Sequence, residues 1–358
     1  MKIFQLVTMI SIPFFAHAQA PQIAIDACKN AISESRCSFN SPHGKVAGSC
    51  LDPAKEKQLL CVPEKNINRP PLGGKQSQRP QPRQHTIVQS DGEIETIKAD
   101  TKPISDNRIK VSINGNQRIL NANGISKHLT GKFPNAGNPN SIKEQKYIFK
   151  IPVNPKIAAN PTPLGMYDFG LGINGIPFDP AAAEWYLGDR QSGWQYEAMS
   201  GAIILGLDEN HAHVQPTGAY HYHAMPTLLV LGLELLSTAH SPLVGWAADG
   251  FPIYALYGYK EPNEENSGII ENTSSYRLKK GKRPVGGNNP GGNYDGTFVA
   301  DYEYVEGTGS LDECNGRITR TPELRDGSYA YFLTKSFPII PRCYKGTPST
   351  DFTLQRAR

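Results

Sequence analysis

The chain has 358 residues, of which 38% are hydrophobic and 20% charged, a composition typical of a soluble globular protein with one large or two smaller domains. Its formal net charge of +4 is concentrated in one short segment, so the rest of the chain is near neutral and lacks the basic surface that nucleic-acid binding requires. Beyond the first twenty residues there is no run of about 18 apolar residues, so the sequence predicts no membrane span.

The N-terminus has the pattern of a secretory signal. Lys2 precedes an apolar run from Ile3 to Phe15, and Ala16-His17-Ala18 is a small-x-small cleavage site. We therefore expect a signal peptide at residues 1–18 and a mature protein that is secreted or periplasmic.

Six cysteines, an even number, indicate disulfides rather than a thiolate metal site in an exported chain. Four of them fall within residues 19–62, which we interpret as a small cysteine-rich module; they are Cys28, Cys37, Cys50 and Cys61. Their spacing leaves three connectivities open. The module is either a stapled cap without activity or a small binding module for a surface or glycan. Cys314 and Cys343 can pair across the C-terminal part of the chain.

Residues 63–86 are rich in proline and glutamine and have no apolar periodicity, which predicts an extended linker. Five basic residues stand against one acidic residue, a surplus of four that equals the net charge of the whole chain. Contact between this basic linker and an anionic envelope polymer is therefore one possible interaction.

Residues 87–358 are dense in glycine, proline, tyrosine and asparagine. Asp-Gly pairs such as Asp249-Gly250 predict hairpin turns, and the aromatic run Tyr329–Thr334 predicts a strand. The leucine-rich stretch from Pro226 to about Ala239 predicts one apolar helix in the core. The fold class that follows is mainly β, an antiparallel sandwich-like domain with one or few helices, preceded by the small disulfide-rich module.

Residues 211–223, HAHVQPTGAYHYH, hold two His-x-His pairs on either side of Pro216-Thr217-Gly218. The fixed φ of proline suits a type I turn, and glycine readily adopts the left-handed conformation that follows such a turn. This segment therefore predicts a hairpin with a three-residue loop. His213 then pairs with His221, and His211 with His223. Side chains alternate along a strand, so four imidazoles share one face while the two neighbouring tyrosines face the other.

Imidazoles on opposed strand positions are close enough to converge on a single ion, and imidazole is the usual ligand of copper and zinc. We therefore predict a copper or zinc site with the ligands His211, His213, His221 and His223. The alternative is a structural polar cluster. Further candidates are His128, which could reach the site from a distant loop, and Asp208 and Glu209, which could orient an imidazole or act as a base.

Several blocks of the chain resemble the YHYH domain family, over about residues 108–347. The blocks include HVQPTGAYHYH at 213–223, HSPLVGWAADGFPIYALYGY at 240–259, YDGTFVADYEYVEG at 294–307, LDECNGR at 311–317 and NGIPFDP at 174–180. The resemblance implies export, since the family's members are exported proteins, and it implies no particular reaction. According to this resemblance, His213, His221 and His223 belong to the motif for which the family is named.

Three functions follow from these observations. The first is an exported protein that binds copper or zinc at the histidine hairpin and holds or delivers the ion. The second is a metalloenzyme, either a metal-dependent hydrolase or a copper oxidoreductase, in which three histidines leave an open position for water or oxygen and Asp208, Glu209 or Tyr222 assists. The third is a non-catalytic surface interaction protein that acts through the cysteine-rich module.

Overall fold

The structure is a computed structural model that describes residues 25–30, 35–41, 44–51, 59–63, 85–88 and 94–354. The chain separates into two compact units, Met1–Pro80 and Gln81–Arg358. The signal peptide expected at residues 1–18 and most of the expected linker, residues 64–84, lie outside the described residues.

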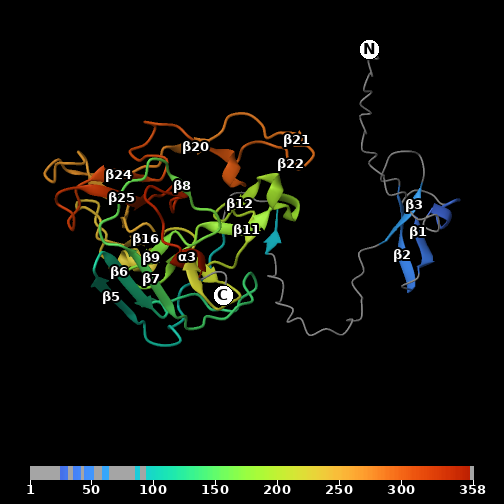
Figure 1. The fold of residues 1–358 in the computed structure, drawn as a ribbon, viewed down its shortest axis with the longest axis horizontal. Coiled ribbons are helices and arrows are strands. Elements are labelled where there is room, and N and C mark those ends of the chain that lie inside the picture. The colour runs from blue at the N-terminus through green and yellow to red at the C-terminus, as the bar shows by residue number, and fades with distance from the viewer. Residues whose placement is uncertain are drawn as a thin grey trace, which may run out of the picture. The chain divides into compact units, whose positions relative to one another are not determined.

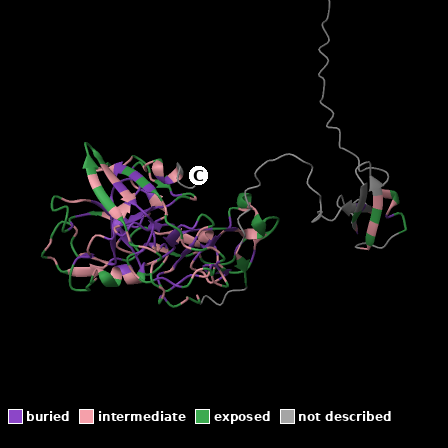
Figure 2. Ribbon diagram, turned by 90° about the horizontal axis from the view of Figure 1, so that it is seen from below, coloured by how far each residue is buried: buried purple, intermediate pink, exposed green. Residues whose placement is uncertain are grey.

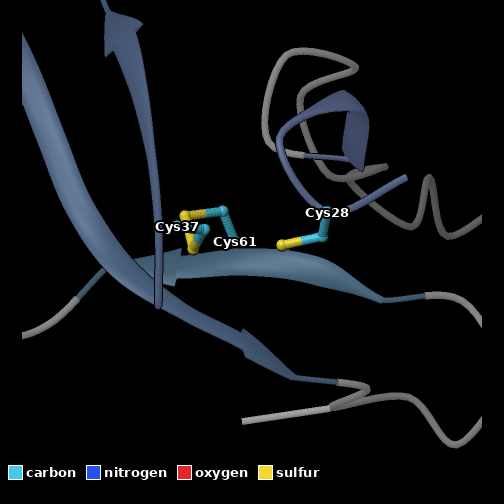
Figure 3. Close-up of side chains that lie close together, drawn as sticks. All are labelled: Cys28, Cys37 and Cys61. Carbon is cyan, nitrogen blue, oxygen red and sulfur yellow. A yellow bond between two sulfur atoms is a disulfide. The ribbon is translucent and has the colours of Figure 1, made fainter. Parts of the chain in front are cut away.

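The first unit contains an antiparallel sheet that two disulfides staple. Its strands, in the order β1-β2-β3, are β1 (Arg36–Ser41), β2 (Gly44–Leu51) and β3 (Leu60–Pro63). Cys28 is bonded to Cys50 and Cys37 to Cys61, which confirms a disulfide-rich module and settles its connectivity. The sulfur atoms of Cys28, Cys37 and Cys61 lie close together (Figure 3), but each is part of a disulfide and none is the thiolate that a metal ion needs.

The second unit is built on an eight-stranded sheet. Its strands, in sheet order, are β14 (Ala212–Val214), β15 (Tyr220–Tyr222), β10 (Pro177–Phe178), β9 (Gly170–Gly172), β16 (Gly245–Ala247), β17 (Pro252–Ala255), β25 (Ser328–Leu333) and β24 (Gly316–Thr319). Most neighbouring strands are antiparallel, as expected, but β10 with β15 and β17 with β25 are parallel. The β10–β15 pair brings the segment around Phe178 beside the histidine hairpin.

A second, antiparallel sheet packs on the first and makes the unit sandwich-like (Figure 1). It consists of β5 (Ile109–Asn114), β6 (Gln117–Ala122) and β7 (Tyr147–Pro152). Burial alternates along β7, so Phe149 and Ile151 face the core that also contains Phe178 and Tyr222. Figure 2 shows buried positions gathered in the middle of the second unit, with exposed positions along its outer strands and loops.

Short paired strands and turns surround this core. The pairs are β4 (Thr86–Ile87) with β13 (Ile203–Ile204), β8 (Thr162–Pro163) with β26 (Cys343–Tyr344), β11 (Ala181–Trp185) with β12 (Gln195–Glu197), β18 (Tyr257–Tyr259) with β19 (Ile269–Glu271), β20 (Tyr276–Leu278) with β23 (Tyr302–Tyr304), and β21 (Val285–Gly286) with β22 (Asn289–Pro290). The 3₁₀ turns are η1 (Tyr186–Gly188), η2 (Arg190–Ser192) and η3 (Val299–Asp301), and a short helix, α3 (Asp351–Leu354), lies near the C-terminus. The mainly β fold is confirmed.

The apolar helix is shorter and more exposed than predicted. The helix α2 spans Thr227–Gly232 and ends there because Glu234 adopts a left-handed conformation, with φ of 53°. Only Leu229 is buried, and Leu231 is 69% exposed, so the expectation of a core helix running to Ala239 is wrong. Among the described residues no helix has the length and apolar character to cross a membrane.

The Asp249-Gly250 turn and the aromatic strand form as predicted. Gly250 has a φ of +93° in the tight connection between β16 and β17, a conformation that favours glycine. The buried Asp249 carboxylate accepts hydrogen bonds from the Tyr331 hydroxyl at 2.5 Å and from the Gly346 N–H at 2.8 Å. Asp249 therefore ties the turn to β25 and to the C-terminal segment.

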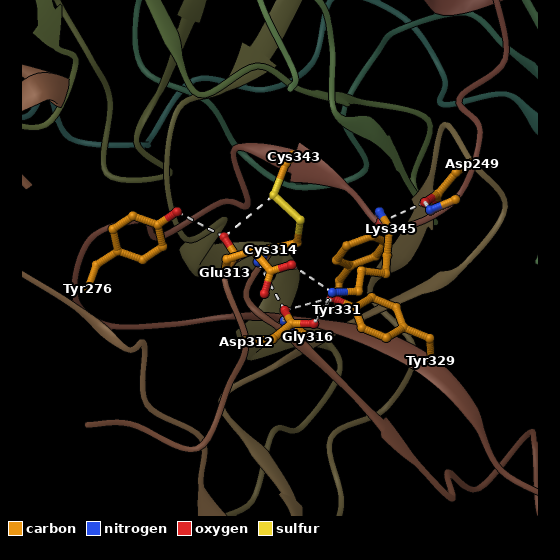
Figure 4. Close-up of a disulfide and its surroundings, with 11 residues drawn as sticks. Asp249, Tyr276, Asp312, Glu313, Cys314, Gly316, Tyr329, Tyr331, Cys343 and Lys345 are labelled. Atoms are coloured by element: carbon orange, nitrogen blue, oxygen red, sulfur yellow. Dashed lines mark hydrogen bonds and ion pairs between the residues drawn. A yellow bond between two sulfur atoms is a disulfide. The ribbon is translucent and has the colours of Figure 1, made fainter. Parts of the chain in front are cut away.

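A disulfide between Cys314 and Cys343 closes the C-terminal part of the domain (Figure 4). Beside it, the Asp312 carboxylate accepts from the Cys314 N–H at 2.9 Å and from the Tyr329 hydroxyl at 2.8 Å. The Lys345 ammonium lies 3.2 Å from the Asp312 carboxylate. Disulfide, carboxylate and ammonium together join β24, β25 and β26.

Replacing both Cys314 and Cys343 by alanine should lower the free energy of unfolding of the second unit by about 3–4 kcal/mol. The reason is that the disulfide closes a loop of 29 residues and so restricts the unfolded chain. Urea unfolding followed by tryptophan fluorescence measures this, because all three tryptophans lie in the second unit. An unchanged midpoint would show that the polar contacts around Asp312 hold the segment without the disulfide.

Candidate metal centre

The histidine hairpin forms in the predicted register. Residues Pro216-Thr217-Gly218 make the loop, and the Gln215 N–H donates to the Ala219 carbonyl at 2.9 Å. On the strands, His213 pairs with His221 and Val214 with Tyr220. Beyond the strand ends, the His223 N–H donates to the His211 carbonyl at 2.8 Å. The turn chemistry therefore places the side chains of His213 and His221 on one face of the hairpin.

Three imidazoles converge on that face. The Nε2 atom of His223 lies 3.0 Å from that of His213 and 3.1 Å from that of His221. The ring centroids are 4.7–4.8 Å apart, so the rings radiate from a common point. All three side chains are buried, with exposures of 2–5%. The group has the residue types and the spacing to hold a metal ion.

Backbone carbonyls fix the tautomers of two of the rings. The Nδ1 of His213 lies 2.8 Å from the Leu205 carbonyl, and the Nδ1 of His221 lies 3.2 Å from the Ala219 carbonyl. A carbonyl only accepts, so both Nδ1 atoms carry the proton even though the Asn138 amide nitrogen is also 3.1 Å from that of His213. Both Nε2 atoms consequently direct a lone pair at the centre of the cluster, as metal ligands do.

Burial keeps the cluster uncharged. Desolvation lowers the pKa of His221 to about 4. It also holds the pKa values of His213 and His223 well below the ordinary value, with a further contribution from the neighbouring imidazoles. The rings are therefore neutral at physiological pH, which is the protonation state that binds a metal ion.

His211, the fourth predicted ligand, does not join the cluster. Its φ of 52° is left-handed, because the chain turns at Asp208 and the His211 N–H donates to the Asp208 carbonyl. The alternation of the strand starts only at Ala212, and the His211 Nδ1 lies 2.8 Å from the Met225 carbonyl instead. The structure thus brings together three of the four histidines.

Asp208 and His128 contact the tyrosine side chains on the opposite face of the hairpin. The Tyr220 hydroxyl donates to the Asp208 carboxylate at 2.7 Å, and the Tyr222 hydroxyl lies 2.6 Å from the His128 Nε2. The Glu209 carboxylate accepts from the backbone N–H of Ala99 at 2.9 Å. Asp208, His128 and Tyr222 are therefore hydrogen-bonded on the tyrosine face, and the Glu209 carboxylate is bonded to the backbone of Ala99.

Sequence reasoning missed two groups that do lie beside the cluster. The carboxylate of Asp179, a buried residue that follows β10, is 3.8 Å from the His221 Nε2. The ring of His85 stacks on that of His213 at 5.3 Å between centroids, although His85 was assigned to the linker. The only sequence signal for Asp179 was its place in the NGIPFDP block, and His85 had none.

Two open clefts lie elsewhere on the second unit. One, of about 490 Å³, is lined by residues that include Tyr304, Asp312 and Tyr329. The other, of about 570 Å³, is lined by residues that include Asn107 and Tyr147. Neither of these two clefts is lined by a histidine of the cluster.

The fold and the cluster define a mainly β protein with a histidine group suited to a metal ion. The family model described as YHYH protein matches residues 148–346, more than half of the chain, and the chain therefore belongs to the YHYH family. Residues 220–223 are the Tyr-His-Tyr-His sequence itself. No curated protein and no solved structure matches the chain.

We expect the Tyr222 hydroxyl to stabilise the fold and not to act as a metal ligand. It accepts from the Asn174 amide at 2.8 Å, so Tyr222→Phe leaves a buried amide unpaired and should cost about 1–3 kcal/mol of unfolding free energy. Urea unfolding measures the loss. The exposed Tyr167 offers a matched control, and Tyr167→Phe should change the unfolding free energy by less than about 0.5 kcal/mol. Equal values for the two variants would contradict the assignment.

Proposed function

We propose that this protein is an exported metal-binding protein that holds one copper or zinc ion through the Nε2 atoms of His213, His221 and His223. The observation that carries the proposal is the convergence of these atoms at 3.0–3.1 Å within a buried site. Imidazole suits both ions, and three neutral ligands leave one position for a further group.

The main competing interpretation is a structural cluster of hydrogen-bonded histidines. His213 and His221 carry their protons on Nδ1, so only His223 can place a proton at the centre. A proton on the His223 Nε2 can form a hydrogen bond to the Nε2 of either His213 or His221. In the other of these two contacts, two nitrogen atoms then remain at about 3 Å with no proton directed between them. The His223 Nδ1 is also buried without a partner among the described residues, so it makes no hydrogen bond in either tautomer. A cation at the centre satisfies all three Nε2 atoms at once.

The spacing fits an ion after a small expansion. At metal–nitrogen distances of about 2.0–2.1 Å, a tetrahedral ion separates its ligand nitrogens by about 3.3–3.4 Å. The His223 Nε2 needs to move from those of His213 and His221 by only a few tenths of an ångström, from 3.0 Å and 3.1 Å.

An exported location agrees with the disulfides, since they persist in oxidising compartments outside the cytosol. We place the protein in the periplasm or the extracellular space on this ground and on the signal-like residues 1–18. The basic residues of the linker would there contact an anionic envelope polymer.

Elemental analysis of the protein from the exported fraction tests the metal site. The wild type should carry about one equivalent of copper or zinc, and the triple variant His213→Ala/His221→Ala/His223→Ala should carry none while remaining folded by circular dichroism. His211→Asn is the matched control, because asparagine tolerates the left-handed backbone there and His211 lies outside the cluster. It should retain the wild-type metal content. A wild type that stays empty after reconstitution would refute the proposal.

A second candidate function, a metalloenzyme, is favoured by Asp179. Its Oδ2 atom lies 3.8 Å from the His221 Nε2 and accepts from the Gln215 side-chain amide at 3.1 Å. This carboxylate lies beside the cluster, where it can accept the proton of a bound water or complete the ligand set. A metal ion in such a site supplies an acidified water or, if it is copper, redox chemistry.

Asp179→Asn separates the two functions. In a hydrolase the variant should retain the metal but lose about 10²–10⁴-fold in turnover of p-nitrophenyl acetate or bis-p-nitrophenyl phosphate, because the amide cannot accept a proton. In a copper oxidoreductase the same comparison is made by oxygen uptake with ascorbate. Turnover equal to that of the wild type would exclude Asp179 as the base, and loss of the metal would identify it as a ligand.

A further inference from the structure

A short segment that emerges from the linker covers the histidine cluster. Residues 85–88, here the strap, contain β4, which pairs with β13 through Ile87 and Ile203. The Val88 N–H also donates to the Ala202 carbonyl at 2.9 Å. The strand β13 leads directly to Leu205, whose carbonyl holds the His213 Nδ1. The strap is therefore fixed to the same piece of chain that orients one of the ligands.

The strap places a fourth imidazole against the cluster. The ring of His85 lies 5.3 Å from that of His213, at an interplanar angle of 27°. If four imidazoles radiate from a tetrahedral ion at metal–nitrogen distances of about 2.0–2.1 Å, neighbouring ring centroids lie about 5 Å apart. The His85 ring is thus already at the separation expected of a fourth ligand, although its nitrogens lie outside the group formed by the other three.

A buried carboxylate holds His85 in the manner of a metal ligand. Glu184 accepts from the His85 Nδ1 at 2.8 Å and from its backbone N–H at 3.0 Å, both through Oε1. Burial raises the pKa of Glu184, but the hydrogen bonds from His85 outweigh this and leave the pKa below its ordinary value. With the proton held on Nδ1, the Nε2 atom of His85 carries the lone pair, which is the arrangement of a carboxylate–histidine–metal triad.

The second oxygen of the same carboxylate has no partner among the described residues. The Glu184 Oε2 is buried and unpaired, and the side chain is only 2% exposed. An unpaired buried acceptor is unfavourable, so its presence requires a reason. A shift of the His85 Nδ1–H from Oε1 to Oε2 would let the imidazole turn while it keeps its hydrogen bond to Glu184.

We propose that His85 is the fourth histidine ligand of the metal ion and that it reaches the ion by turning off the His213 ring on its Glu184 support. The proposal rests on the proposed function of the three-histidine site. His85 is the most exposed of the four imidazoles, since its side chain is 17% exposed and the other three histidines are 2–5% exposed. It is therefore the last ligand to close on an ion and the first to leave, which makes the strap the place where the ion exchanges with solvent or with an acceptor.

Counting the bound imidazoles tests the proposal on the full chain loaded with Cu²⁺. Pulsed electron paramagnetic resonance should detect four coupled imidazoles in the wild type and three in His85→Gln, which keeps a hydrogen-bonding side chain for Glu184. His211→Asn is again the matched control and should show four. Four imidazoles in His85→Gln, or three in the wild type, would overturn the assignment of His85 and leave the three-histidine site standing. A wild type that binds no Cu²⁺ would instead refute the proposed function.

The rate of metal release provides a second readout that a purely structural strap would not change. His85→Gln should release Cu²⁺ to a chelator at least about 10–100-fold faster than the wild type, because the loss of a ligand weakens a metal site at least as much as the loss of a group that supports a ligand. Glu184→Gln should keep four imidazoles and release the ion about tenfold faster, because the neutral amide orients the ring less firmly. Release at the wild-type rate in both variants would overturn the proposal, whatever their stability.

Discussion

The register of the β14–β15 hairpin is the constraint on which the site depends. A slip of one residue in β15 would turn that strand over, so that His221 and His223 would face the core and Tyr222 would face the site beside His213. Gly218 prevents the slip, because its φ of +89° closes the three-residue loop and a Cβ there would lie 2.6 Å from the Cβ of Lys143. The loop thus fixes both the metal face and the core face of the hairpin.

The two faces support each other. On the core side, Tyr222 is held through its hydroxyl by Asn174 and His128, and it stands between His221 and His223 in the chain. On the site side, the Leu205 carbonyl orients His213. The imidazoles are therefore positioned by packing and by hydrogen bonds that do not involve an ion, so little entropy remains to be lost when an ion binds.

The sequence predicted those features that depend on neighbouring residues in the chain. It did not predict those that depend on contacts between distant segments. His213 and His221 were predictable from a period of two and a Pro-Thr-Gly loop, and the mainly β fold from turn residues and aromatic runs. The position of His211 was not, because a left-handed residue and the Met225 carbonyl redirect it. Asp179 reaches the site through the parallel pairing of β10 with β15, and His85 through β4 on β13. No short-range pattern encodes such long-range pairings.

The burial of the cluster bears on which chemistry it suits. With exposures of 2–5%, the three histidines offer a bound ion little contact with solvent, and they line neither of the two clefts described above. Holding an ion requires only that the site close, whereas turnover requires a substrate to come within reach of it. Beside the cluster the Asp179 carboxylate is buried, and His85 of the strap is the partly exposed group. In the role proposed for His85, the ion leaves only after this imidazole turns away, and such slow exchange suits a protein that retains its ion.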